Sequence, residues 1–264
     1  MTFAFDRATA LQSTGPGSFT GEMSRDFWVV QGPNGGYLAS IALRGATETL
    51  RATDRAPRSM HVRYLAPPSA GTFELHVQRV REGRSMSILG VSLRQNGREC
   101  VTASVCFSAP FGSVSFQDIT PPAALPLDHA VVMPKVIPMN HQFDMRVAIG
   151  GAPRSQARAE TGGYTRFADG RPLDMLALAT LWDSWPPAAF FRAIDPQPTS
   201  GIPTVEASVY FRRQLPFDGF EATDHVLLHA RSRMAHDGFI EEDAAVWTQR
   251  GELLVQSRQL ALLR

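Results

Sequence analysis

Residues 181–187, LWDSWPP, place one carboxylate in apolar surroundings at the end of a helical pattern. Asp183 stands there between Trp182 and Trp185. Apolar neighbours and a helix C-terminus both disfavour a charged carboxylate, so we expect the pKa of Asp183 to rise toward values useful for a general base. The alternative is a capping role, in which Asp183 begins a short helix that ends near residue 191.

An amide on the last predicted strand is a second candidate. Apolar side chains alternate along residues 253–263, and Gln259 falls on this largely apolar face. A buried glutamine needs hydrogen-bond partners, and its amide can hold a water molecule at one end while the other end meets a carboxylate. The alternative is a glutamine that faces solvent at a strand end. Thr204 opens another strand, and taken alone it indicates only β-propensity.

A glycine-rich turn, Pro33-Asn34-Gly35-Gly36, directly precedes an amphipathic run. Backbone N–H groups at a helix start are unpaired and carry partial positive charge, so Gly35 and Gly36 could receive an acyl carbonyl or a phosphate. The alternative is that the two glycines only allow a helix to pack closely on a sheet.

Several other chemistries lack their sequence signatures. No G-x-G-x-x-G turn, no Gly-Lys-Ser/Thr phosphate loop and no G-x-S-x-G element is present. On a strand, His225 and His229 would stand ~13 Å apart, too far to share a metal, and no Cys/His cluster has zinc spacing. We therefore expect neither a metal site nor a cofactor.

Composition narrows the class of protein. The chain has 264 residues, of which 44% are hydrophobic and 19% charged, as in globular proteins with a sizeable core. A net charge of +1 gives no reason to expect nucleic acid or an anionic membrane as partner, and no run approaches the ~18 apolar residues of a membrane span. Cys100 and Cys106 lie in one strand, where a disulfide is geometrically poor. They indicate free thiols in a reducing cytoplasm.

The elements that position these residues follow from periodicity. Apolar residues recur with a 3.6-residue period over 35–50, which predicts a helix. A second, buried helix is predicted over 171–183, with Pro172 in its first turn, where a missing N–H costs nothing. Asn96-Gly97 predicts a type I′ hairpin, and a last hairpin is expected at 249–251. The remaining strand segments are 59–68, 71–82, 85–108, 141–151, 157–167, 204–216, 222–238 and 239–263.

The order of elements occurs twice. Superimposing Gly97 on Gly251 aligns SLRQNGRECVTASVCF with VWTQRGELLVQSRQLA, so each half is one helix followed by long antiparallel strands. Between the halves, five prolines interrupt QDITPPAALPLDHAVVMPKVIP, which predicts an inter-domain linker.

A helix wrapped by an antiparallel sheet, twice over, is the double hot-dog architecture. The segments GPNGGYLASIALRGA, HVRYLAPP, LWDSW and GELLVQSRQLALL resemble those of the TesB-like acyl-CoA thioesterases, in the same order and over nearly the whole chain. The resemblance implies an α+β fold in which two tandem hot-dog domains, each with a long helix, form one continuous sheet. The expected N-terminal domain covers 1–115, the Pro-rich linker 116–140 and the C-terminal domain 141–264.

The resemblance also implies a reaction and its residues. Asp183, Thr204 and Gln259 match the catalytic positions of the family, with Glu206 and Ser208 as substitutes if the register differs by two. They would activate a water that hydrolyses acyl-CoA to free fatty acid and CoA. Predicted substrate contacts are Gly35, Gly36, Trp182 and Trp185. Arginines at 79, 81, 84, 212 and 213 could hold CoA phosphates, or be ordinary solvated charges. A homo-oligomer is possible.

Two other functions compete with this one. A hot-dog hydratase or dehydratase would need a paired Asp and His in a short signature that the sequence lacks. A catalytically silent double hot-dog that binds acyl-CoA, or serves as a scaffold, would not need the three matched residues. Release of free CoA distinguishes the hydrolase from a binding protein.

Overall fold

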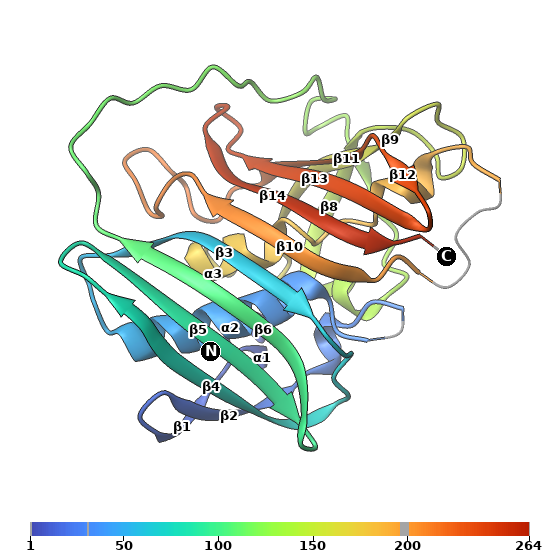
Figure 1. Ribbon diagram of the computed structural model, residues 1–264. Coiled ribbons are helices and arrows are strands. Elements are labelled where there is room, and N and C mark those ends of the chain that lie inside the picture. The colour runs from blue at the N-terminus through green and yellow to red at the C-terminus, as the bar shows by residue number, and fades with distance from the viewer. Residues whose placement is uncertain (1, 31, 196–200, 264) are drawn as a thin grey trace.

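The computed structural model describes residues 2–30, 32–195 and 201–263. Two helices lie on the inner side of a large curled sheet (Figure 1). The helical elements are α1 (Ala4–Ala8), η1 (Arg25–Phe27), α2 (Gly35–Leu50), η2 (Pro138–Gln142), α3 (Met175–Leu181) and η3 (Ala188–Phe191). The strands of the N-terminal half are β1 (Gln12–Gly15), β2 (Ser18–Met23), β3 (Ala56–Tyr64), β4 (Gly71–Glu82), β5 (Met86–Gln95) and β6 (Arg98–Ser108).

The C-terminal half adds β7 (Val131–Val132), β8 (Phe143–Ile149), β9 (Ala159–Phe167), β10 (Thr204–Phe211), β11 (Val226–Ser232), β12 (Ala235–His236), β13 (Phe239–Trp247) and β14 (Leu253–Leu262). The 14 strands form one sheet in the order β1-β2-β4-β5-β6-β3-β10-β14-β13-β11-β9-β8-β7, with β12 paired to β13. The halves join where β3 pairs antiparallel with β10. The predicted architecture, two helices wrapped by one continuous antiparallel sheet, is confirmed.

Capping residues at both ends set the bounds of helix α2. The side chain of Asn34 caps its start by accepting a hydrogen bond from the Tyr37 N–H at 2.9 Å, and Arg51 ends it in the left-handed region. Most of its residues are buried, because one side packs on β4, β5 and β6 and another on α3. The predicted bounds of this helix, 35–50, are confirmed.

Helix α3 is shorter than expected. It spans seven residues from Met175, so the prediction of a helix from 171 with Pro172 in its first turn is wrong. The reason is Asp174, whose carboxylate accepts the Ala177 N–H at 2.8 Å and starts the helix after the proline. The expected burial is confirmed, since Ala177 through Leu181 are all buried.

Both predicted hairpin turns are present. Asn96 and Gly97 have φ of 53° and 75° between β5 and β6, as a type I′ turn requires. Gly251, with φ of 88°, turns the chain between β13 and β14. The β1–β2 hairpin was not predicted; its short first strand is largely exposed and carries little apolar alternation.

The Pro-rich segment runs over the C-terminal half, as the green trace between β6 and β7 shows (Figure 1). Hydrogen bonds hold it there, including Gln117 to the Gly251 carbonyl at 2.8 Å and the Leu125 N–H to the Ala148 carbonyl at 2.9 Å. The range 116–140 also contains β7 and the first turn of η2. The domain limits at 115 and 140 stay a prediction. Within the described residues, no helix combines the length and apolar character needed to cross a bilayer.

Candidate active site

Asp183 lies in the turn that follows α3 and reaches the start of α2. Its backbone N–H donates to the Thr180 carbonyl at 3.2 Å. Its Oδ2 accepts two hydrogen bonds at 2.9 Å, one from the Gly36 N–H and one from Asn34 Nδ2. The capping alternative is excluded, because the short helix η3 is preceded by Pro187 and the Asp183 carboxylate binds the N-terminus of α2 instead.

The two glycines permit this close approach. A Cβ at Gly35 would lie 2.9 Å from Asp183 Oδ2, and one at Gly36 would lie 2.6 Å from the Thr180 carbonyl oxygen. A Cβ at Gly35 would also lie 3.1 Å from the Tyr64 ring of β3, so the two glycines allow α2 to approach both the segment that carries Asp183 and the sheet. Ser40 Oγ donates to Thr180 Oγ1 at 2.9 Å and ties the same two helices together.

The pKa of Asp183 is raised to about 6. Burial is the largest cause, since it disfavours the charged carboxylate, while hydrogen bonds from Gly36, Asn34, Gly35 and Gln259 lower the pKa in part. The carboxylate is therefore ionised at neutral pH, yet basic enough to accept a proton, which is the balance a general base needs.

Gln259 and Thr204 meet on neighbouring strands beside this carboxylate. The Thr204 hydroxyl donates to Gln259 Oε1 at 2.5 Å, from the first residue of β10 to the body of β14. Gln259 is buried, and its amide lies close enough to Asp183 to lower the pKa of that carboxylate. The three residues predicted as catalytic therefore lie together, with Thr204 and Gln259 directly hydrogen-bonded beside Asp183.

The two register alternatives lie elsewhere. Glu206 is exposed and pairs with Arg63 at 3.5 Å, and Ser208 is hydrogen-bonded to His61 at 2.9 Å. Of these three candidates, Thr204 is the one that contacts the amide of Gln259. The alignment that selects Thr204 therefore fits the geometry better than one that selects Glu206 or Ser208.

Glu242 is a buried carboxylate that the sequence analysis missed. Its Oε1 accepts from Gln259 Nε2 at 2.9 Å and its Oε2 accepts from the Ala188 N–H at 2.6 Å. Burial raises its pKa to about 7, and the charge of Asp183 contributes to the increase. A signal was present, because Ile240, Ala244 and Val246 alternate with it along the apolar face of β13.

Tyr64, at the end of β3, also reaches the start of α2. Its hydroxyl donates to the Gly35 carbonyl at 2.8 Å. Burial, followed by the nearby charge of Asp183, raises its pKa well above the usual range, so the phenol stays protonated. Asn34 and Tyr64 were not predicted as site residues, because their roles depend on contacts between distant segments.

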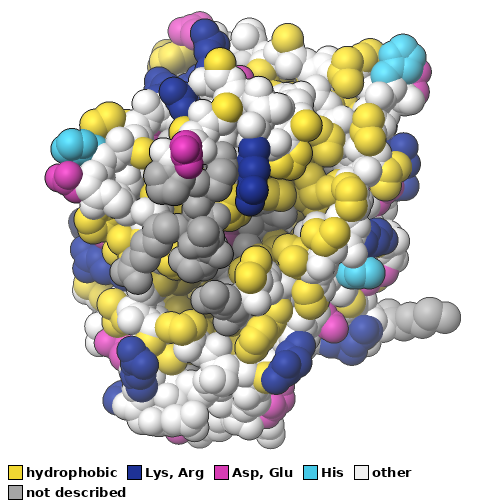
Figure 2. All heavy atoms as spheres, turned by 90° about the vertical axis from the view of Figure 1, so that its right-hand side faces the viewer, with side chains coloured by type: hydrophobic (Ala, Val, Ile, Leu, Met, Phe, Trp, Pro, Cys, Tyr) yellow, Lys and Arg dark blue, Asp and Glu magenta, His cyan; other side chains and the backbone are white. Residues whose placement is uncertain are grey.

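The site residues lie toward one side of the molecule, where α2 and β10 begin and β3 ends (Figure 1). Figure 2 views that side and shows apolar side chains gathered around a hollow in the middle of the face. Trp182 and Trp185 are buried, and Trp185 Nε1 donates to Thr165 Oγ1 at 2.7 Å. Substrate contact by Gly35, Gly36, Trp182 and Trp185 stays a prediction.

The five arginines considered for CoA phosphates lie at the other end of the strands. Those at 79, 81 and 84 belong to the end of β4 and the turn before β5, which is level with the start of β3 rather than with Tyr64. Those at 212 and 213 follow the end of β10, whereas Thr204 begins it. A strand of eight or nine residues separates these ends by about 25 Å.

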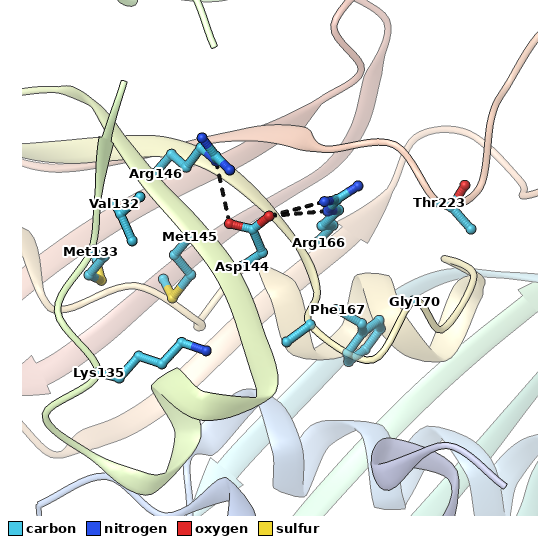
Figure 3. A pocket seen from close by; sticks show the side chains of 11 residues that line it. Val132, Met133, Lys135, Asp144, Met145, Arg146, Arg166, Phe167, Gly170 and Thr223 are labelled. Atoms are coloured by element: carbon cyan, nitrogen blue, oxygen red, sulfur yellow. Dashed lines mark hydrogen bonds and ion pairs between the residues drawn. The ribbon is translucent and has the colours of Figure 1, made fainter. Parts of the chain in front are cut away.

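A separate cavity of about 500 Å³ lies near β8 and β9 (Figure 3). Figure 3 shows Asp144 between Arg146 and Arg166, and these ion pairs measure 3.4 and 3.2 Å. Neither Asp183 nor Gln259 lines the cavity, so it is distinct from the cluster described above. The lining residues are Val132, Met133, Lys135, Asp144, Met145, Arg146, Arg166, Phe167, Ala168, Gly170 and Thr223.

Within the described residues, the cysteines form no disulfide, and the histidines belong to no metal-binding group. Cys100 and Cys106 are both free thiols, as predicted, and burial raises the pKa of each. His225 and His229 pair with Asp144 and Glu160 at 3.2 and 2.7 Å. In the described part of the chain, no group of three or more His, Cys, Asp or Glu side chains is arranged to hold a metal.

Two domain models of one family match the sequence. The N-terminal domain of acyl-CoA thioesterase matches residues 24–108, and the C-terminal domain of acyl-CoA thioesterase matches residues 117–263. Acyl-CoA thioesterase 2 of Haemophilus influenzae is 26% identical to the chain, over 87% of each sequence.

Solved structures share the fold. A hot-dog protein from Alicyclobacillus acidocaldarius, described as conserved and of unknown function, superimposes with a TM-score of 0.90 at 29% identity and covers 100% of this chain and 99% of its own. The acyl-CoA thioesterase II TesB2 of Mycobacterium marinum superimposes with a TM-score of 0.81 at 21% identity, covering 99% and 98%. The double hot-dog fold expected from the sequence is confirmed.

Proposed function

The chain belongs to the acyl-CoA thioesterase family, and on that premise we propose that it hydrolyses the thioester of an acyl-CoA to a free fatty acid and CoA. The observation that carries the proposal is the contact network of Asp183. This carboxylate has a pKa raised to about 6 and is hydrogen-bonded to the start of α2, beside the linked pair Thr204 and Gln259.

Water is the nucleophile in the proposed reaction. A water molecule beside Asp183 gives a proton to the carboxylate while its oxygen bonds to the thioester carbonyl carbon. Thr204 donates its hydroxyl hydrogen to Gln259, so its oxygen lone pairs are free to accept a hydrogen bond from that water. The N–H of Gln259 that faces Asp183 supplies a donor to the water oxygen.

Collapse of the tetrahedral intermediate completes the reaction. The carbon–sulfur bond breaks, the sulfur leaves with the electron pair of that bond, and the proton held by Asp183 neutralises the CoA thiolate. The N–H of Gly36 is engaged by Asp183 rather than directed at a substrate. Its role in the proposed mechanism is therefore to hold the base, and the thioester is placed next to the start of α2.

The proposal is tested by release of free CoA from medium- and long-chain acyl-CoAs, measured with a thiol reagent. We expect the wild-type chain to release CoA and Asp183→Asn to lower kcat by at least ~10²-fold, the scale of losing a positioned general base. Glu206→Gln is the matched control, because Glu206 is exposed on the same strand as Thr204 and should leave kcat unchanged.

Two outcomes contradict the proposal. Wild-type protein that binds acyl-CoA without releasing CoA would be a binding protein rather than a hydrolase. Hydrolysis that proceeds at the wild-type rate in Asp183→Asn would show that this carboxylate is not the base.

A further inference from the structure

The amide of Gln259 is held at both ends. Its Oε1 accepts from the Thr204 hydroxyl at 2.5 Å, and its Nε2 donates to Glu242 Oε1 at 2.9 Å. Glu242 lies opposite Gln259 in the antiparallel pair β13–β14 and is only 9% exposed. Its other oxygen accepts from the Ala188 N–H at 2.6 Å, which links the sheet to η3.

These contacts fix which end of the amide faces which neighbour. While Glu242 is ionised it only accepts hydrogen bonds, so Gln259 must then turn its nitrogen toward Glu242. The amide oxygen then faces Thr204, whose hydroxyl can donate. The second N–H of the same nitrogen is left for the neighbourhood of Asp183, whose pKa the Gln259 side chain lowers.

We infer that Glu242 is a positioning residue that keeps the Gln259 amide with its nitrogen toward Asp183 and the attacking water. The inference rests on the hydrolysis proposed above. Glu242 touches Gln259 rather than the reacting atoms, so it acts through that side chain. Without it, nothing in the pair Thr204–Gln259 selects the orientation, because a hydroxyl can either donate to an oxygen or accept from an N–H.

The substitution Glu242→Gln should reverse the amide of Gln259. The Ala188 N–H is a donor in any variant, so it would engage the oxygen of the substituted side chain, which is the only acceptor that side chain has. The nitrogen of the substituted side chain would then face Gln259, which would have to present its own oxygen there. That rotation turns the Gln259 nitrogen toward Thr204 and away from Asp183, so the base and the water lose the N–H donor that faced them.

Titration of Glu242 supplies a readout that a purely structural role would not give. The charged groups that act on it are Asp183 from the turn after α3 and Glu241 from its own strand, and its hydrogen-bond donors are Ala188 and Gln259. Burial raises the pKa of Glu242 to about 7 and that of Asp183 to about 6, and each protonation should lower the rate. Protonation of Glu242 releases the amide, and protonation of Asp183 removes the base. The acid limb of the rate profile should therefore carry two protonations.

The test compares the pH dependence of acyl-CoA hydrolysis in the full-length wild-type protein, Glu242→Gln and Glu241→Gln. We expect Glu242→Gln to lower kcat about tenfold with KM within about twofold of wild type, the scale of one lost hydrogen bond to a charged group. Its acid limb should show one protonation instead of two. Glu241→Gln is the matched control, because the neighbouring side chain points to the other face of β13, and it should keep kcat and both protonations.

A second variant separates loss of the carboxylate from a general disturbance of the fold at this position. Glu242→Asp retains a carboxylate at this position and should retain both protonations in the acid limb. The inference is overturned if Glu242→Gln keeps the wild-type kcat, or if Glu242→Asp loses a protonation just as Glu242→Gln does. A failure of hydrolysis in the wild-type protein, or an unchanged rate in Asp183→Asn, would instead count against the proposed function.

Discussion

The two halves of the molecule carry different side chains at a matched pair of sheet positions. Gln259 and Val105 each lie eight residues after the hairpin glycine, and their strand partners are Glu242 and Leu89. The apolar pair is fully buried in the N-terminal half, and the polar pair is 9% exposed or less in the C-terminal half. The hot-dog sheet therefore needs no polar group at these positions in order to pack.

The polar pair lowers the stability of the fold at neutral pH, whereas the apolar pair carries no such charge. The folded pKa of Glu242 is about 7, above its ordinary value of 4.5, so the folded state binds this proton more tightly than the unfolded chain does. The stability contributed by the protonated group is full below about pH 4.5 and is lost as the pH rises through about 7. A charge that weakens the fold at neutral pH is expected where the charge has a chemical task.

Helices α2 and α3 differ in length and in what each half supplies to the candidate site. Helix α2 has 16 residues and offers two glycines at its start, whereas α3 has seven and ends where Asp183 turns toward α2. One half thus supplies the N–H groups that hold the base, and the other supplies the base, the amide and the hydroxyl. The candidate site therefore belongs to neither half alone.

The apolar pair Leu89–Val105 gives the largest expected effect. Leu89→Glu would place a carboxylate opposite Val105, with no Gln259-like donor across the strand pair, and we expect the free energy of unfolding to fall by about 3–5 kcal/mol. Chemical denaturation measures the change. Ile88→Glu is the control, since its side chain lies on the other face of β5 and should cost much less. Equal stability of the two variants would mean that the N-terminal half accepts a polar group as readily as its counterpart.

The reverse change replaces the amide of the polar pair Glu242–Gln259. Gln259→Val gives the C-terminal half the side chain that the N-terminal half has, and we expect kcat to fall by about 10²-fold, the scale of losing one preorganised donor. The rate of CoA release measures it. Gln256→Val on the same strand is the control, because Gln256 contacts Arg212 and lies on the other face of β14. A kcat within about twofold of wild type in Gln259→Val would remove the amide from the mechanism.

Much of the fold follows from local sequence signals. The 3.6-residue pattern over 35–50, the Asn96-Gly97 turn and the long alternating strands each depend on neighbours in the chain, and the structure has them where they were predicted. The start of α3 was misplaced because the Asp174 cap competes with Pro172 as a start signal. The β1–β2 hairpin escaped notice because exposed edge strands need little apolar alternation.

The candidate site was less accessible to sequence reasoning. Asp183 stood out by its apolar neighbours, but Thr204 and Gln259 were chosen mainly through a family resemblance. Glu242 lies in the acidic run IEED, where a charged residue is expected to face solvent. Strand alternation nevertheless places it on the buried face. Asn34 and Tyr64 gain their roles from contacts with residues far away in the chain, and no local pattern encodes such contacts.

The pH dependence of kcat/KM for acyl-CoA hydrolysis by the wild-type protein reports directly on whether Asp183 acts as the base. Burial raises the pKa of Asp183 to about 6, and only the ionised carboxylate can accept a proton from water. We therefore predict that kcat/KM falls as the pH drops through about 7 and 6, and that it is level above that range until other groups titrate. A value of kcat/KM that is constant between about pH 5 and 8 would rule out Asp183 as the base, because its protonation would then leave the rate unchanged.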